Sequence, residues 1–398
     1  MRFTRMCRAA AGLALSGVSA VAAQTQSPAF PANAALDGLV TKQMTDAGIM
    51  GLAAAVIVNR QVVWMKGYGF ADWQRTRPFT PNTIMNVGSI AKPFTGVAMM
   101  RAVHEGKLSL DEDINTYLPF RVVNPHRPNE RITLRHLATH TSGITDRWEV
   151  YAGTYHYGGD SPEPLGRFLE QYFAPDGKHY SRDNFLDAKP GALREYSNIG
   201  AGLAGYIVER AFGEPLNVYT RRHIFTPLRM TRTGWFLSEV DLANHSTLFV
   251  SQNGMTIPIP LYGITTYPDG GIRTSVADLS KFFLALLNGG EYQGTRILDA
   301  RNAAEMQRFQ FSDANRPENY PAADGNSGLF WRTKFNGAMV GHGGNDPGLQ
   351  TEMLSDVAKE VGVILFMNTS LSGPDQRASS AIFDALRKYA DSLRAGGR

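Results

Sequence analysis

The chain has 398 residues, of which 43% are hydrophobic and 19% are charged, and its formal net charge is +4. This composition is ordinary for a globular protein, and it excludes a disordered chain, a collagen and a coiled coil. The length allows one large domain with an insertion, or two domains.

The first 23 residues differ in character from the rest of the chain. Three arginines precede a small apolar stretch over 9–20, and Val21-Ala22-Ala23 offers a small-x-small cleavage site. A short membrane anchor is the alternative, but the stretch is below the roughly 20 residues that a span needs. The pattern predicts a signal peptide over 1–23 and export to the periplasm or the extracellular space.

Removal of this segment would change the charge and the cysteine content. Three arginines and no acid leave with it, so the net charge falls from +4 to +1, and no nucleic-acid partner is expected. The one cysteine, Cys7, also leaves. The mature chain is therefore predicted to have no disulfide, no cysteine nucleophile and no Cys-ligated metal. No later segment is apolar over a length that spans a bilayer.

The mature chain opens with a helix and a hairpin. Apolar residues at helical spacing predict a helix over 35–47, and two apolar runs joined by a turn pair predict a β-hairpin over 51–70. The segment 89–105 is typical of a helix that ends before Gly106.

Helices and loops alternate in the middle of the chain, and strands return at its end. The middle is rich in loops, with helices predicted at 132–139, 199–212 and 276–287. Three short apolar runs and an amphipathic helix close the chain, at 338–342, 350–354, 361–367 and 378–394. This order predicts a sheet built from both chain ends, with a mostly helical insertion between them.

Ser89-Ile90-Ala91-Lys92 has the spacing S-x-x-K. In a helix, positions i and i+3 share a face, so the lysine amine can reach the serine hydroxyl. A lysine accepts a proton only when it is neutral, so we expect Lys92 to be buried in a polar cluster. The motif is weak by itself, because an ordinary surface lysine on a helix gives the same spacing.

Two further triplets carry groups suited to acyl transfer. In Tyr196-Ser197-Asn198, the tyrosine can relay a proton and the asparagine can hold a carbonyl while it bonds a lysine, although a helix N-cap has the same composition. In His342-Gly343-Gly344, the glycines allow close approach of a substrate and a following N–H can complete an oxyanion hole. A glycine turn beside a structural histidine is the alternative.

These three motifs, in this order, resemble the S-x-x-K, Y-x-N and K-T-G or H-x-G signatures of the serine β-lactamase and penicillin-binding protein superfamily. The resemblance is to its branch of class C β-lactamases, DD-peptidases, family VIII esterases and D-aminopeptidases. The segments 83–92, 132–143 and 268–279 also resemble that family, and the likeness extends over about 35–390.

The resemblance implies an α/β (α+β) fold in which an antiparallel sheet is flanked by terminal helices and carries a mostly helical inserted domain. It implies one hydrolase domain over 24–398, with an α/β part at about 30–105 and 290–398 and a helical part at about 106–289.

The resemblance also implies a role for each motif residue. Ser89 would attack the substrate and become acylated, while Lys92 and Tyr196 would move its proton and that of the leaving group. The substrate and oxyanion contacts would come from Asn198, His342, Gly343, Gly344 and Asn345. No metal and no cofactor are implied.

Histidine stands at position 342 where the β-lactamases proper carry lysine, so a β-lactam, a D-amino peptide and a short-chain ester all stay open as substrates. The alternative function is a penicillin-binding receptor or scaffold that acylates without turnover. The complete Ser, Lys, Tyr and Asn set favours an enzyme over that receptor.

Two remaining patterns each allow two interpretations. His136 and His140 have i, i+4 spacing that suits a metal, but the glutamate of H-E-x-x-H is absent, which favours helix packing and capping. The aromatic stretch 151–157 either borders a substrate groove or forms a solvent-facing loop. The oligomeric state is not predicted.

Overall fold

The computed structural model describes residues 30–252 and 255–396. The described residues from Ala32 onward belong to one compact unit. The predicted signal peptide at 1–23 lies outside the described residues and stays a prediction. No helix in the described part of the chain has the length and apolarity that crossing a bilayer requires.

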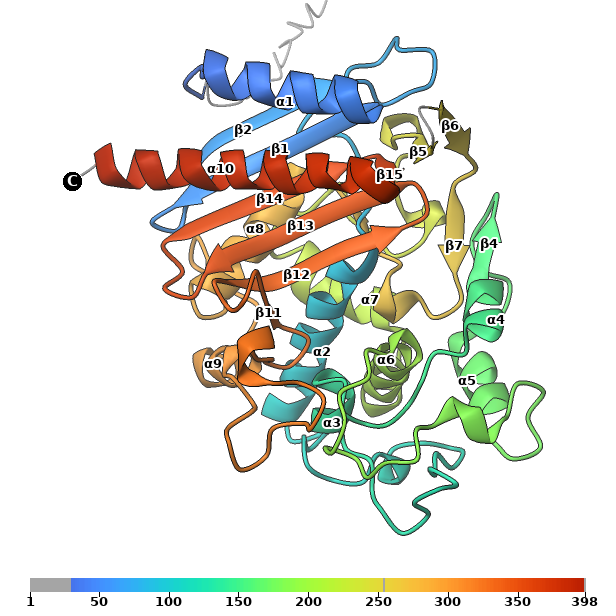
Figure 1. Ribbon diagram of the computed structural model, residues 1–398. Helices are drawn as coiled ribbons and strands as arrows, with labels where there is room; N and C mark the ends of the chain where they lie inside the picture. Colours follow the sequence, from blue (N-terminus) through green and yellow to red (C-terminus); the bar gives the residue numbers. More distant parts are fainter. Residues whose placement is uncertain (1–29, 253–254, 397–398) are drawn as a thin grey trace, which may run out of the picture. The chain divides into compact units, whose positions relative to one another are not determined.

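A six-stranded antiparallel sheet forms the centre of this unit, in the order β11-β12-β13-β14-β1-β2 (Figure 1). Its strands are β1 (Gly51–Val58), β2 (Gln61–Gly69), β11 (Arg332–Lys334), β12 (Met339–Asp346), β13 (Leu349–Asp356) and β14 (Val361–Met367). Strand β1 pairs with β14, and Leu52 lies opposite Met367. The two ends of the chain therefore share one sheet, as the sequence predicted.

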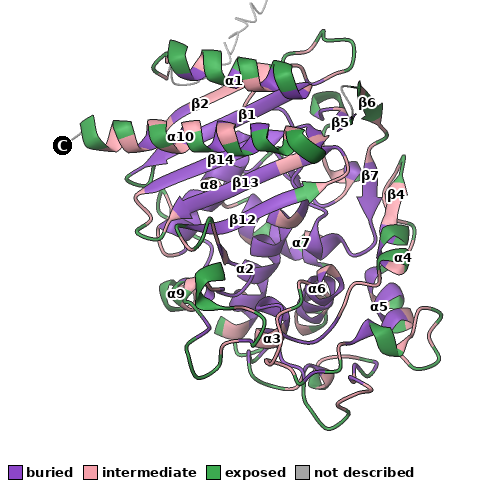
Figure 2. Ribbon diagram, viewed as in Figure 1, coloured by how far each residue is buried: buried purple, intermediate pink, exposed green. Residues whose placement is uncertain are grey.

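Every residue of β1 and of β14 is buried, because helices cover both faces of the sheet. Helix α10 (Gln376–Gly396) crosses one face beside α1 (Ala34–Ala47), and α8 (Val276–Leu287) packs on the opposite face (Figure 1). Figure 2 shows the buried strands between these layers and the exposed outer sides of α1 and α10.

The other helices lie between the two halves of the sheet in sequence. They are α2 (Ala91–His104), α3 (Leu134–Ala138), α4 (Trp148–Tyr151), α5 (Leu165–Phe173), α6 (Asn198–Phe212), α7 (Leu216–Thr220) and α9 (Ala300–Gln307). Local capping sets several boundaries. For example, Asn33 Oδ1 accepts a hydrogen bond from Leu36 N at 3.0 Å where α1 begins, and Gly48 ends α1 with a φ of 68°.

Short strands also occur outside the central sheet, and those between residues 155 and 274 lie within the part that the sequence predicted as mostly helical. They pair as β3 (Met85–Asn86) with β8 (Arg273–Thr274), β4 (Tyr155–Tyr157) with β7 (Tyr262–Ile264), and β9 (Glu291–Tyr292) with β10 (Thr295–Arg296). A further three-stranded sheet joins β15 (Thr369–Leu371), β5 (Leu248–Gln252) and β6 (Met255–Ile259). Strands of two to five residues leave little periodic signal in a sequence.

Strand β12 is longer than the predicted run at 338–342, because its pairing with β13 continues through Gly343, Gly344 and Asn345 to Asp346. Backbone hydrogen bonds do not need apolar side chains, so hydrophobicity did not indicate this extension. The extension carries the glycine motif along an ordered strand.

One hydrophobic core runs from the sheet into the helices. Within it, the rings of Phe94 on α2 and Phe282 on α8 stack with centroids 3.7 Å apart. This packing fixes the position of α2, whose first turn carries Lys92 and which directly follows Ser89 and Ile90. The core therefore holds the S-x-x-K motif in place against the sheet.

Candidate active site

Ser89 lies at the beginning of a helix. A short 3-10 helix, Gly88–Ile90, leads directly into α2. The N–H of Ser89 is therefore in the first turn, where N–H groups have no acceptor within the helix. Gly88 has a φ of 54°, and a Cβ atom at this position would lie 2.9 Å from Asp346 Oδ2. The turn before the nucleophile position thus favours glycine on both conformational and steric grounds.

Lys92 is fully buried, as expected from its proposed role as a base. Its Nζ lies 3.0 Å from Ser89 Oγ, 2.7 Å from Asn198 Oδ1 and 3.0 Å from the backbone oxygen of Asp269. The last two partners can only accept hydrogen bonds from the amine. The lysine is therefore held by two fixed acceptors while it faces the serine hydroxyl.

Asn198 is positioned by the beginning of helix α6. Ser197 is the N-cap, and its Oγ accepts a hydrogen bond from Gly200 N at 2.8 Å. The carboxylate of Asp146 accepts hydrogen bonds from Ser197 Oγ at 2.8 Å, Asn198 N at 2.7 Å and Ile199 N at 3.0 Å. Within this triplet Ser197 is therefore the helix N-cap, and Asn198 contacts Lys92.

Tyr196 is half-buried, and its ring is packed between charged and aromatic groups. The ring of His140 lies 4.2 Å from it at an interplanar angle of 31°, and Lys92 Nζ is 4.9 Å from its centroid. The guanidinium of Arg332 lies 5.6 Å from the same centroid. These neighbours fix the ring, and its edge borders the cavities beside Ser89.

The glycines of the His342 motif allow strand β12 to approach the segment before Ser89. A Cβ atom on Gly344 would lie 2.1 Å from the backbone oxygen of Val87, and Thr351 Oγ1 donates to the same oxygen at 2.9 Å. A Cβ atom on Gly343 would lie 2.5 Å from Glu352 Oε2. Strand β12 therefore brings Asn345 to the cavities that Ser89 borders.

His342 itself lies behind this strand edge. Its side chain is 1% exposed, and Nδ1 lies 2.8 Å from the backbone oxygen of Gly343. Burial, with Arg332 and Lys92 nearby, lowers the pKa of His342 well below its usual range. The imidazole is thus neutral at pH 7, and it does not line either cavity beside Ser89.

Two cavities meet at Ser89. The first, which we call the Arg332 cavity, has a volume of about 390 Å³ and is lined by Ser89, Tyr196, Arg332, Lys334, Gly343, Gly344, Asn345, Gln350 and Glu352. The second, the Asp346 cavity, has a volume of about 340 Å³ and is lined by Ser89, Trp148, Tyr151, Tyr155, Tyr196, Asn198, Asn345, Asp346, Pro347 and Ser370.

The two cavities differ in charge. Lys334 is paired with Glu352, so among residues 30–252 and 255–396 the guanidinium of Arg332 is the charge on the first side that has no ion pair. On the second side, Asp346 Oδ1 accepts a hydrogen bond from Tyr155 at 2.8 Å, and burial raises the pKa of Asp346 to about 6. A substrate across Ser89 would therefore meet a cation at one end and an acid at the other.

A second carboxyl lies behind Lys92. Asp269 is 1% exposed, and its Oδ1 accepts a hydrogen bond from the hydroxyl of Tyr151 at 3.0 Å. Burial raises the pKa of Asp269 to about 7, although Lys92 opposes the shift. The carboxyl is therefore partly protonated near neutral pH.

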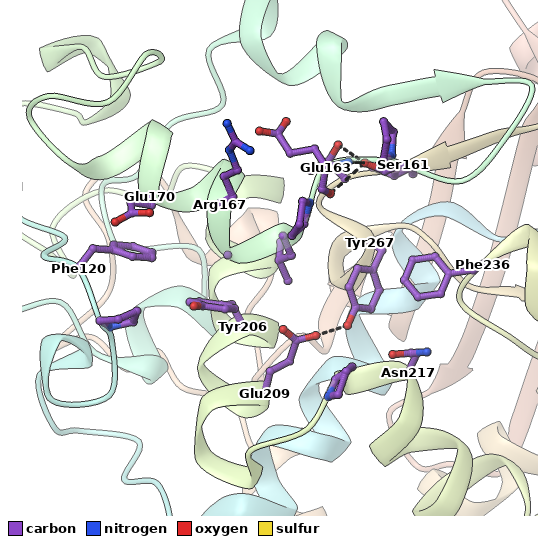
Figure 3. Close-up of a pocket in the computed structure, with 18 residues that line it drawn as sticks. Phe120, Ser161, Glu163, Arg167, Glu170, Tyr206, Glu209, Asn217, Phe236 and Tyr267 are labelled. Carbon is purple, nitrogen blue, oxygen red and sulfur yellow. Dashed lines mark hydrogen bonds between the residues drawn. The ribbon is translucent and has the colours of Figure 1, made fainter.

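A larger cavity, of about 660 Å³, lies in the helical part of the structure (Figure 3). It contains none of the predicted site residues. Its half-buried acid, Glu209, accepts hydrogen bonds from the Tyr267 hydroxyl and from Leu216 N, and desolvation raises the pKa of this carboxyl. The chemistry expected from the motifs belongs instead to the smaller cavities at Ser89.

The two histidines at i, i+4 spacing have separate structural roles. His136 Nδ1 accepts a hydrogen bond from Thr133 N at 3.3 Å in the capping box that opens α3. His140 is buried with a φ of 60°, and its Nδ1 accepts a hydrogen bond from Ser197 N at 3.2 Å. Packing and capping, the interpretation that the sequence favoured, therefore account for both rings.

Sequence reasoning missed several residues that hold or border this site, among them His140, Asp146, Asp269, Arg332 and Asp346. His140 and Asp146 act across long sequence separations, on Ser197 and on the first turn of α6. Asp269 contacts Lys92 through its backbone oxygen, so its side-chain type carried no signal. Asp346 lies two residues after Gly344, so the glycine motif was a signal that could have indicated it.

Known proteins share both the sequence pattern and the fold. The Beta-lactamase family model matches residues 36–387. Protein flp of Staphylococcus aureus (strain MRSA252) is 24% identical over 335 residues, which are 84% of this chain and 62% of that protein. The chain thus spans about three fifths of the length of this curated relative.

Solved structures agree with this match. The octameric penicillin-binding protein homologue from Pyrococcus abyssi is 26% identical and has a TM-score of 0.70, covering 91% of this chain and 77% of its own. The penicillin-binding protein from Bacillus halodurans is 23% identical and shows the same fold with a TM-score of 0.67, covering 87% of this chain and 98% of its own. The family match extends over all three motifs and most of the chain, and the protein therefore belongs to the Beta-lactamase family.

Proposed function

We propose that this protein is an exported serine hydrolase that cleaves an amide or ester through an acyl-enzyme on Ser89. The observation that carries the proposal is the position of the buried Lys92 Nζ, 3.0 Å from Ser89 Oγ. A neutral amine has two hydrogens, which Asn198 Oδ1 and the Asp269 oxygen can accept, and its lone pair is then free to take the serine proton.

The first step forms the acyl-enzyme. Ser89 Oγ attacks the substrate carbonyl carbon as its proton passes to Lys92 Nζ, and the carbonyl oxygen becomes an oxyanion. The backbone N–H groups of Ser89 and Asn345 would stabilise this oxyanion. The C–N or C–O bond then breaks, and the leaving group takes the proton from Lys92, directly or through the Tyr196 hydroxyl.

The second step releases the product. A water molecule loses a proton to the same base and attacks the acyl carbon, and Ser89 Oγ recovers its proton as the ester bond to the enzyme breaks. The water must approach through the cavities that border Ser89. The rate of this step separates a hydrolase from a receptor that only acylates.

The substrate class follows from the charge beside Ser89. Because His342 is buried and neutral, it cannot supply the positive charge of the lysine that β-lactamases proper carry. We therefore propose a D-amino peptide or short-chain ester as the main substrate, with β-lactams hydrolysed less efficiently.

Pre-steady-state kinetics test this function. The purified chain without residues 1–23 is mixed with a chromogenic cephalosporin, a p-nitrophenyl ester and a D-amino peptide. We expect sustained turnover of at least one substrate, and its loss in Ser89→Ala. A stoichiometric burst that then stops would support a receptor, whereas undiminished turnover in Ser89→Ala would refute the mechanism.

A further inference from the structure

The Asp346 cavity combines one acid with several aromatic rings. Trp148 and Tyr151 come from α4, Tyr155 comes from β4, and all three line the cavity with Asp346. The rings of Trp148 and Tyr151 lie 6.1 Å apart at 48°, and those of Tyr151 and Tyr155 lie 5.7 Å apart at 89°. The three rings therefore border the Asp346 cavity in different orientations.

Trp148 is 68% exposed, although it is one of the larger apolar side chains of the protein. It lies at the cavity, so this exposed ring belongs to the surface that a ligand would meet. Tryptophan offers the strongest cation–π partner among the aromatic side chains. An exposed tryptophan beside an acid is thus suited to an organic cation.

The carboxylate of Asp346 has one oxygen available. Oδ1 accepts the hydrogen bond from Tyr155, while Oδ2 has no hydrogen-bond partner and no ion pair among residues 30–252 and 255–396. Oδ2 faces the turn before the nucleophile, because a Cβ atom on Gly88 would lie 2.9 Å from it and one on Gly270 would lie 3.5 Å away. The free oxygen is therefore next to the reacting serine.

The cavity on the other side of Ser89 has the opposite character. Its Arg332 guanidinium lies 5.6 Å from the centroid of the Tyr196 ring, and Lys334 there is already paired with Glu352. A cation would consequently be repelled from the Arg332 cavity and attracted to the Asp346 cavity. The opposite charges of the two cavities therefore favour one orientation of a charged substrate across Ser89.

We propose that the Asp346 cavity binds an ammonium group of the substrate, between the Asp346 carboxylate and the rings of Trp148 and Tyr155. This inference rests on the proposed function, because it names the substrate class of the same site. It assigns substrates in which an amine or quaternary ammonium lies a few bonds from the scissile carbonyl.

Isosteric ester pairs test the proposal. The p-nitrophenyl esters of 4-(trimethylammonio)butyrate and 5,5-dimethylhexanoate differ in charge at nearly constant shape. A second pair, choline butyrate and 3,3-dimethylbutyl butyrate, places the same difference in the leaving alcohol. We expect kcat/KM to favour the cationic member of at least one pair by about tenfold or more.

The variants assign this preference to the cavity. Asp346→Asn keeps an acceptor for Tyr155 but loses the charge, so the preference should fall at least fivefold. Trp148→Ala removes an exposed ring and should reduce it several-fold. Asp384→Asn on the exposed side of α10 makes the same change in net charge and should leave the preference unaltered.

Equal kcat/KM within both pairs would overturn the ammonium site, as would a preference that Asp346→Asn leaves intact. Ser89→Ala separates this result from a failure of the proposed function. If Ser89→Ala is inactive and the preference is absent, the inference alone fails. If Ser89→Ala hydrolyses the esters at the wild-type rate, the proposed function fails.

Discussion

Asp146 is predicted to act as a positioning residue for Asn198, 52 residues away in the sequence. Its carboxylate accepts three hydrogen bonds from the first turn of α6, at 2.7, 2.8 and 3.0 Å. That turn carries Asn198, whose Oδ1 lies 2.7 Å from Lys92 Nζ. The substitution Asp146→Ala removes every one of these acceptors.

The size of the effect follows from these contacts. Loss of a helix cap costs about 1 kcal/mol, and hydrogen bonds to a charged group contribute about 1.5–3 kcal/mol each without being additive. We expect Asp146→Ala to lower the free energy of unfolding by about 2–4 kcal/mol. A displaced Asn198 should lower kcat by about tenfold or more, which is about 1.4 kcal/mol in the barrier.

Steady-state kinetics and urea unfolding together measure both effects. A positioning role predicts that kcat falls more than KM rises, and that Asp146→Asn, which keeps one acceptor oxygen, restores part of kcat. Asp299→Ala is the matched control, because Asp299 caps α9 by accepting hydrogen bonds from Arg301 N at 2.9 Å and Asn302 N at 3.3 Å. It should cost about 1 kcal/mol of stability with unchanged kcat.

The reasoning about Asp146 would be refuted by Asp146→Ala retaining the wild-type kcat at a temperature where the variant is folded. An equal loss of kcat in Asp299→Ala would also refute it, because general destabilisation would then explain both variants.

Two further predictions concern Lys92 and Asp269. Lys92→Arg places a guanidinium that stays protonated at this position and cannot take the serine proton, so kcat/KM should fall about 100-fold or more, and near-normal rates would exclude Lys92 as the base. Burial raises the pKa of Asp269 from 3.8 in the unfolded chain to about 7 in the folded protein. As pH rises from about 4 to 7, the unfolded chain loses this proton before the folded protein does, so the free energy of unfolding falls over that range. The stability of the wild type relative to Asp269→Asn should therefore fall by about 1 kcal/mol per pH unit between pH 5 and 7. Urea unfolding differences that do not change with pH would contradict the burial argument.

The sequence predicted the elements that have strong local signals. Residues 51–70 formed the expected hairpin, with Asn59 and Arg60 at positive φ in its turn. The helix expected over 199–212 appears as Asn198–Phe212, because Ser197 supplies a recognisable cap and Gly213 ends it with a φ of 67°. These signals depend on side chains within a few residues of one another.

Contacts across long separations had no comparable signal. The predicted helix over 132–139 is shortened to Leu134–Ala138, because the chain then enters a buried turn with His140 at positive φ. That turn places His140 against Tyr196, a contact that neither segment encodes by itself. The same holds for Asp146, whose hydrogen bonds join segments that only the fold brings together.

The site motifs could be identified in the sequence because each requires particular residue types at a fixed spacing. The three-residue step from Ser89 to Lys92 becomes a 3.0 Å contact only because helix α2 begins there. In contrast, the opposite charges of the two cavities arise from Arg332 and Asp346. Arg332 lies on β11 at the edge of the sheet, and Asp346 lies at the end of the neighbouring strand β12. Strand register, which the sequence left undetermined, decides that arrangement.

The central claim is that Ser89 carries the acyl group, and peptide mass spectrometry of the trapped intermediate tests it most directly. The protein is mixed with a slowly deacylating β-lactam or activated ester, quenched in acid and digested. We predict that the acyl mass is found on the peptide that contains Ser89 and is absent in Ser89→Ala. An adduct on any other residue, or turnover by Ser89→Ala at the wild-type rate, would contradict the mechanism.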